Sequence, residues 1–212
     1  MRKLSLPFAL FFFSILTSCT AIILKLAGAK KPDVEKIASI EEKYKQMGFS
    51  LNDYFIMKED SMLNQFFRYP NEVRLFDKTG IMIAEDSLAG KKECSGNIVN
   101  FIKVVPPLTY AHRDSSQSIK ACLESIRHIN NLSSPAFDNS EYDYLVIVYW
   151  NLFSGKVRNE DYIKSIQNAI TKNQYSKIQL IPVNCDMYEG VDWDQKFEEY
   201  KERVKADRRV NG

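Results

Sequence analysis

The residues of this 212-residue chain most able to do chemistry are its four cysteines, Cys19, Cys94, Cys122 and Cys185. Thiol–disulfide exchange needs an attacking thiolate and a second thiol that resolves the mixed disulfide, and the two commonly stand in a Cys-x-x-Cys motif. No two of these cysteines have that spacing, and the chain has only two histidines. The spacing does not suit a zinc site either, so we expect no metal and no cofactor.

Two of the thiols, those of Cys122 and Cys185, are expected to be small buried side chains, because free cysteine is among the most buried residue types. If the domain is exported, the alternative is a disulfide between two of the cysteines Cys94, Cys122 and Cys185. Cys94 stands at the start of a predicted helix, whose N-terminus could lower the pKa of the thiol. A capping or solvent-facing role is the alternative for this residue.

The first residues have the features of a targeting segment. The chain begins with Arg2 and Lys3, and Leu4 to Leu24 contains no charged side chain, which is typical of a signal sequence. Leu16-Thr-Ser-Cys19 resembles the lipobox of bacterial lipoproteins, and this resemblance implies that Cys19 is lipidated. The alternative is an uncleaved transmembrane helix, since a bilayer requires about 20 apolar residues. Both interpretations predict attachment to the cell membrane or outer membrane, with the domain facing the periplasm or the exterior.

The sequence predicts an anchor at residues 1–24, a linker at 25–32 and one domain over 33–212. A chain with 45% hydrophobic and 12% aromatic residues can bury one sizeable core. Three basic residues in or beside the anchor account for the positive net charge, and without them the chain holds 26 basic and 27 acidic side chains. This balance argues against nucleic acid as a partner, because a phosphate-binding surface needs a basic excess.

Strands alternate with helices along the domain, which predicts an α/β fold with a mixed sheet. The central unit consists of a buried strand at Tyr144–Trp150, a helix beginning near Tyr162 and a second strand at Lys177–Cys185. Two strands joined by a helix form a right-handed parallel βαβ unit. A glycine-containing turn between Val73–Asp77 and Ile81–Ala84 predicts a hairpin. Periodicity further predicts helices over residues 33–47, 61–67, 97–105, 116–130 and 193–209 and a short strand over 54–57.

Two parts of the chain resemble thioredoxin-like proteins. Residues 146–157 are similar to the segment of that family that runs from a buried strand through an aromatic pair into the redox turn. Tyr69-Pro70, the hairpin and the helix at 97–105 resemble the closing part of the fold, although here they precede the βαβ unit. The resemblance implies a three-layer thioredoxin-like domain with a mixed sheet of about five strands, in a permuted order or with a rebuilt sheet.

The resemblance places Ser154 and Val157 at the two cysteine positions of the redox motif. Neither side chain supplies a thiol, so the chain is not expected to exchange disulfides there. The rim of the turn is instead predicted to be a binding surface, because aromatic residues are over-represented at binding hot spots and ligands of open α/β sheets lie at the carboxyl ends of the strands. This surface would consist of Trp150, Phe153, Ser154, Lys156, Asp186, Tyr188 and Trp193.

The leading hypothesis is a membrane-attached envelope lipoprotein whose redox-inactive domain acts as a binding or scaffold module, with an envelope protein as its partner. An enzyme is the alternative, either a single-cysteine redox protein using Cys94 or Cys185 or an unrecognised hydrolase. A third hypothesis is a structural lipoprotein whose domain spaces or caps an envelope assembly.

Overall fold

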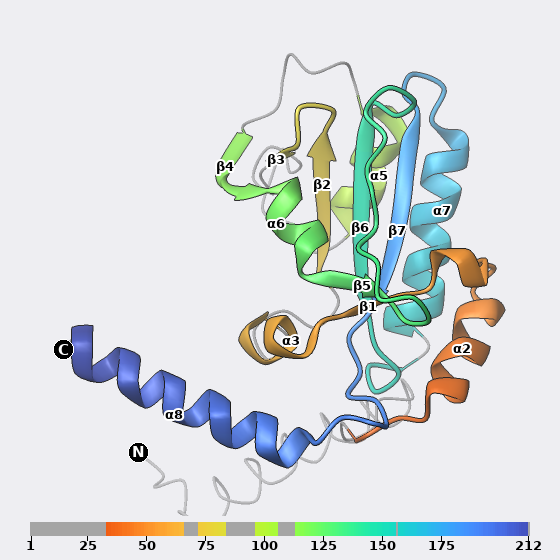
Figure 1. The fold of residues 1–212 in the computed structure, drawn as a ribbon. Coiled ribbons are helices and arrows are strands. Elements are labelled where there is room, and N and C mark those ends of the chain that lie inside the picture. The colour runs from red at the N-terminus through yellow and green to blue at the C-terminus, as the bar shows by residue number, and fades with distance from the viewer. Residues whose placement is uncertain (1–32, 66–71, 84–95, 106–112, 156, 212) are drawn as a thin grey trace, which may run out of the picture.

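The computed structural model describes residues 33–65, 72–83, 96–105, 113–155 and 157–211. These residues form an α/β domain around a seven-stranded mixed sheet with the strand order β4-β3-β2-β6-β7-β1-β5 (Figure 1). The strands are β1 (Phe55–Met57), β2 (Val73–Asp77), β3 (Ile81–Ile83), β4 (Arg113–Ser118), β5 (Ile126–His128), β6 (Tyr144–Trp150) and β7 (Ile178–Asn184). The helices are α2 (Ile37–Gln46), α3 (Glu59–Gln65), α5 (Gly96–Val104), α6 (Ile119–Glu124), α7 (Tyr162–Lys172) and α8 (Trp193–Asn211), with a 3₁₀ turn η1 (Leu51–Asp53) and a π-helical turn η2 (Val157–Asp161).

The βαβ unit predicted from the sequence is confirmed. All seven residues of β6 are buried, and β6 pairs in parallel with β7 from Tyr144 opposite Ile178 to Trp150 opposite Asn184. The connecting helix α7 buries Ile163, Ile166 and Ala169 on one face. β-branched and aromatic side chains fit a pleated strand that is covered on both sides, so the continuous apolar run of β6 forms the centre of the sheet.

Alternate residues of β6 point to opposite faces of the sheet, and different helices cover the two faces. Arg74 on β2 lies opposite Ile147 of β6 and contacts Cys122 of α6, so α6 covers the face to which Ile147 points. On the other face, the ring of Tyr44 in α2 packs against the ring of Trp150 with 6.0 Å between centroids. In Figure 1, α6 lies in front of the sheet. Helices α5 and α7 lie side by side, away from α6.

The predicted hairpin is present. β2 pairs antiparallel with β3 and also with β6, where Asp77 lies opposite Tyr144. The turn between β2 and β3 is closed by a hydrogen bond from Gly80 N to Asp77 O (2.9 Å) and by one from Thr79 N to Asp77 Oδ1 (2.8 Å). Because β2 and β6 run in opposite directions, this turn lies beside the amino end of β6.

The helix predicted over residues 116–130 was wrong, and so was the number of about five strands. Only Ile119–Glu124 is helical, because serines cap both ends: the Ser118 side chain accepts a hydrogen bond from Ala121 N (3.2 Å) and the Ser125 hydroxyl donates to Cys122 O (2.6 Å). The chain on either side forms strands, β4 and β5, and β5 pairs antiparallel with β1. These two strands account for the difference between five and seven.

The first described residues lie beside the loop that follows β7. Glu35 forms an isolated β-bridge with Tyr188, in which Glu35 N donates to Met187 O (2.8 Å) and Glu189 N donates to Glu35 O (3.0 Å). This pairing delays the start of α2 to Ile37, four residues later than the sequence predicts. The first described residues are therefore fixed to the loop that follows β7.

Several predicted features lie outside the described residues, namely the anchor, the linker and Tyr69-Pro70. Within the described ranges, no helix combines the length and the apolar character that crossing a membrane requires.

The turn at Gly80 gives a test of packing between the hairpin and α6. Gly80 has φ +80°, and a Cβ at this position would lie 2.7 Å from Cγ2 of Ile119, whereas Gly190 has φ +88° with no atom within 4 Å. Placing alanine in the left-handed region costs about 1–2 kcal/mol at either site. Overpacking against a stiff β-branched side chain adds about 1–3 kcal/mol for Gly80→Ala alone. Chemical denaturation should therefore show a larger loss in the free energy of unfolding for Gly80→Ala than for the matched Gly190→Ala. Equal losses in the two variants would contradict the close approach of Gly80 to Ile119.

Candidate functional site

Polar side chains close the turn that follows β6. The Asn151 side-chain oxygen accepts a hydrogen bond from Ser154 N (2.8 Å). Asn159, on η2, donates through Nδ2 to Gly155 O (3.0 Å) and to the main-chain oxygen of Asn151. Asn151 and Asn159 are 0% and 1% exposed. The turn is thus held internally by side-chain amides.

Asp186 ties the end of β7 to the same turn. Its two carboxylate oxygens accept hydrogen bonds from Leu152 N (3.0 and 2.7 Å), and Asn184 Nδ2 donates to Oδ2 (2.7 Å). Asp186 N in turn donates to Asn184 Oδ1 (3.0 Å). A buried carboxylate is tolerated where hydrogen-bond donors surround it, and Asp186 is only 3% exposed. Its observed contacts therefore position the main chain.

The predicted binding surface is largely covered. Trp150 lies in the core against Tyr44, and Trp193 packs edge-on against Tyr188, with ring centroids 5.8 Å apart. Phe153 is half-buried. The buried members of the predicted surface are Trp150, Ser154, Asp186, Tyr188 and Trp193. Lys156 and the predicted lipidation site Cys19 lie outside the described residues. A role for this surface in recognition stays a prediction, with little side-chain area from these five residues to support it.

The loop before α8 is fixed by a three-membered polar network. Arg127 on β5 donates through Nη2 to the Tyr188 hydroxyl (2.6 Å) and forms an ion pair with Glu59 of α3. The Tyr188 hydroxyl also donates to Glu59. Burial and the hydrogen bond to Glu59 raise the pKa of Tyr188 above its ordinary value, so the phenol remains protonated. The network joins α3, β5 and the loop before α8, and sequence reasoning missed it because β5 was predicted to be helical.

Both cysteines of the described domain are free and buried. The Cys185 thiol donates only a weak contact to Val183 O (3.8 Å). Burial, and then the negative charge of Asp186, raise the pKa of the Cys185 thiol well above its usual value. A thiol that keeps its proton is a poor nucleophile, because the thiolate is the reactive form. Cys94 lies outside the described residues.

Cys122 accepts a hydrogen bond from a buried arginine. Arg74 Nη1 lies 3.1 Å from Cys122 Sγ, while Nε and Nη2 donate to the two carboxylate oxygens of Glu72 at 2.9 and 3.0 Å. Burial alone would lower the pKa of Arg74, but the bidentate pair with Glu72 outweighs it and raises the pKa. The guanidinium also stacks on the ring of Tyr149, 5.3 Å from its centroid. Arg74 thus carries a charge that Glu72 already balances.

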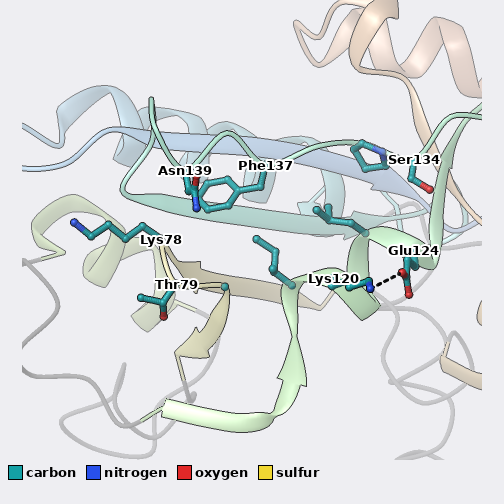
Figure 2. A pocket seen from close by; sticks show the side chains of 11 residues that line it. Lys78, Thr79, Lys120, Glu124, Ser134, Phe137 and Asn139 are labelled. Carbon is teal, nitrogen blue, oxygen red and sulfur yellow. Dashed lines mark ion pairs between the residues drawn. The ribbon is translucent and has the colours of Figure 1, made fainter.

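A groove of about 350 Å³ lies on the α6 face of the sheet (Figure 2). Its apolar part is formed by Ile119 and Leu123 of α6 and by Phe137 of the loop before β6. Lys78 and Asn139 lie toward one end and Glu124 and Ser134 toward the other. The complete lining is Lys78, Thr79, Gly80, Ile119, Lys120, Leu123, Glu124, Ser134, Pro135, Phe137 and Asn139. Three segments distant in sequence meet here, so no local pattern could have revealed the groove.

Among the described residues, no group of three or more His, Cys, Asp and Glu side chains is arranged to hold a metal ion. Comparison of the chain with protein families, with curated proteins and with solved structures found no match. The function must therefore be inferred from the geometry of this chain itself.

Because the Cys185 thiol stays protonated in the folded state, we expect the stability of the domain to fall as the pH rises into the alkaline range. An unfolded thiol ionises with a pKa of about 8.5, whereas the folded thiol keeps its proton to higher pH. Above about pH 8.5 the folded state therefore binds more protons than the unfolded state, and the free energy of unfolding falls by up to about 1.4 kcal/mol per pH unit. Urea denaturation between pH 8 and 9.5 should show a flatter dependence for Cys185→Ala than for the parent. Parallel curves would contradict the raised pKa.

Proposed function

We propose that the protein is a membrane-attached binding or scaffold module of the cell envelope, whose domain has a permuted thioredoxin-like fold without thiol chemistry. The observation that carries this proposal is the closed turn after β6, where Asn151, Asn159 and Asp186 form an internal hydrogen-bond network. A redox site at this position needs an accessible pair of thiols. The chain instead has Ser154, which is buried.

The arrangement of strands supports the thioredoxin-like part of the proposal. In that fold, the strand before the redox turn lies between a parallel partner and an antiparallel hairpin, and the closing helix packs beside the helix of the redox turn. Here β6 lies between parallel β7 and antiparallel β2, with β3 beyond β2. Helix α5, which follows the hairpin, packs against α7. The neighbours in space agree although the hairpin comes first in the chain, which favours a permuted order.

The position of the first described residues supports attachment at one end of the domain. Glu35 is hydrogen-bonded beside Tyr188, at the carboxyl ends of β6 and β7. Residues 25–32 can span at most roughly 30 Å when fully extended. An anchor at residues 1–24 would therefore hold this end of the sheet close to the membrane. The amino end of β6, with the β2–β3 turn, would face away from it.

The thiol part of the proposal predicts that the folded full-length protein does not reduce insulin. Peptide-resolved alkylation should label Cys122 and Cys185 slowly in the folded protein and rapidly in denaturant, because both thiols are buried. A dithiol oxidoreductase serves as the positive control in both assays. Insulin turnover, with rapid alkylation of any cysteine in the folded protein at neutral pH, would favour the single-cysteine enzyme instead.

The anchor part predicts that the mature protein carries lipid on Cys19. Labelling of cells with a clickable fatty acid, followed by intact-mass measurement, should give a labelled species that begins at Cys19. The label should disappear in Cys19→Ser and persist in the matched Cys94→Ser, since acylation requires the thiol of the lipobox residue. An unlabelled protein with the full unprocessed mass would support the transmembrane alternative.

A further inference from the structure

The groove on the α6 face has walls that are already fixed by contacts with the sheet. Ile119 N donates to Gly80 O (3.0 Å), which joins α6 to the β2–β3 turn. The facing segment is held by hydrogen bonds from the Ser134 hydroxyl to Ile126 O (3.1 Å) and from Gln179 Nε2 to Ala136 O (3.2 Å). A site whose walls are in place before binding loses less conformational freedom when a ligand enters. The groove is thus preorganised.

The size of the groove favours a small molecule over a protein surface. Ligand sites commonly have volumes of about 300–1,000 Å³, and this groove lies at the lower end of that range. Its volume corresponds to roughly a dozen water molecules. A stable protein interface would instead require about 800 Å² of surface on each partner. The apolar side chains of Ile119, Leu123 and Phe137 suit a compact hydrophobic body.

The charges around the groove favour an anionic group on that body. Lys120 is paired with Glu124 at the end near Ser134, with 3.9 Å between the charged atoms (Figure 2). Asp138 does not line the groove, and its carboxylate accepts hydrogen bonds from the main chain and hydroxyl of Ser140. In the part of the chain that the structure describes, Lys78 has no ion-pair partner. Among the described residues that line the groove, its cation is therefore the uncompensated charge, and Asn139 adds an amide beside it.

We propose that this groove binds a small organic carboxylate with a compact apolar body, its carboxylate toward Lys78 and Asn139 and its body on Ile119, Leu123 and Phe137. The proposal deepens the proposed function, since it rests on the domain being a binding module and names the class of ligand. In the proposed attachment, the anchor holds the opposite end of β6, and the Lys78 end of the groove then opens toward the aqueous side. Ligands could reach it without leaving solution.

Three probes with one body and different head groups test the proposal: 3-phenylpropionate, 3-phenylpropan-1-ol and 3-phenylpropylammonium. The full chain is placed in lipid nanodiscs with ¹³C-labelled methyl groups on isoleucine and leucine, and NMR follows the methyl signals of Ile119 and Leu123. These signals report the groove itself and separate binding from partition into lipid. The carboxylate should cause saturable shifts at the lowest concentration, the alcohol at a higher one and the ammonium at the highest.

Lys78→Met keeps most of the apolar stem and removes the charge. It should weaken binding of the carboxylate about threefold to fivefold, as expected for an exposed ion pair, and leave the alcohol unchanged. Lys164→Met is the matched control, an exposed lysine on α7 that should alter neither affinity. Leu123→Ala should weaken all three probes, and thermal unfolding of each variant verifies that it folds.

Three outcomes would overturn the proposal: no saturable shift with any probe, equal affinity for carboxylate and ammonium, or equal effects of Lys78→Met and Lys164→Met. These outcomes are distinguishable from failure of the proposed function. If no probe binds, but insulin turnover is absent and Cys19 is lipidated, the proposed ligand class is rejected and the proposed function is retained. If insulin is reduced, the proposed function falls whatever the groove binds.

Discussion

The structure depends on the burial of β6 along its whole length. All seven of its side chains are covered, and each fully buried large apolar residue contributes roughly 1.5–3 kcal/mol relative to an exposed one. A strand covered on both faces cannot leave the backbone groups at its end unpaired, because an unsatisfied buried N–H costs about 1–3 kcal/mol. The residues directly after β6 must therefore find internal hydrogen-bond partners. Asn159 and Asp186 provide these partners for the main chain at Asn151 and Leu152.

This constraint gives a physical reason why the described polar groups at the carboxyl end of the sheet are buried and hydrogen-bonded. A nucleophile needs solvent access for its substrate and a group that stabilises its charged form. Asn151 and Asn159 are neutral, and the Asp186 carboxylate already accepts three hydrogen bonds from Leu152 and Asn184. Cys185 adjoins this network, but burial and the nearby carboxylate both oppose ionisation of its thiol. The same contacts that stabilise the end of β6 thus disfavour redox chemistry there.

Sequence reasoning succeeded where one residue pattern determined one element. The continuous apolar run of β6, the largely apolar run of β7 and the amphipathic pattern of α7 each extend over seven or more residues, so they are visible locally. It failed where short segments depend on distant partners. β5 has only three residues, and Ile126, Arg127 and His128 form a strand because β1 is available beside them. The Ser118 and Ser125 caps could have signalled a shorter helix. The apolar spacing of three and four residues continues past Ser125, however, and outweighed that signal; it consists of Ile119, Leu123, Ile126 and Ile129.

The two candidate sites, the turn after β6 and the groove, also differ in how far the sequence could predict them, because both depend on contacts between distant segments. The turn after β6 was identified from consecutive residues, but whether its aromatic side chains lie outside or inside depends on α2 and β5, which pack from elsewhere in the chain. Tyr44 covers Trp150, and the loop at Tyr188 is fixed by Arg127 from β5. The groove is assembled from the β2–β3 turn, α6 and residues 134–139, so its position required the strand order.

The two ends of β6 have opposite environments. At the carboxyl end, the chain entry at Glu35 and the loop at Tyr188 cover the strands. At the amino end, the β2–β3 turn and residues 134–139 leave an uncovered apolar surface beside Lys78. The charge of buried Arg74 is balanced by Glu72, whereas exposed Lys78 has no ion-pair partner among the residues that the structure describes. Because an unbalanced charge beside exposed apolar surface attracts molecules that carry both features, the amino end of the sheet is better suited to recognition than the closed turn after β6.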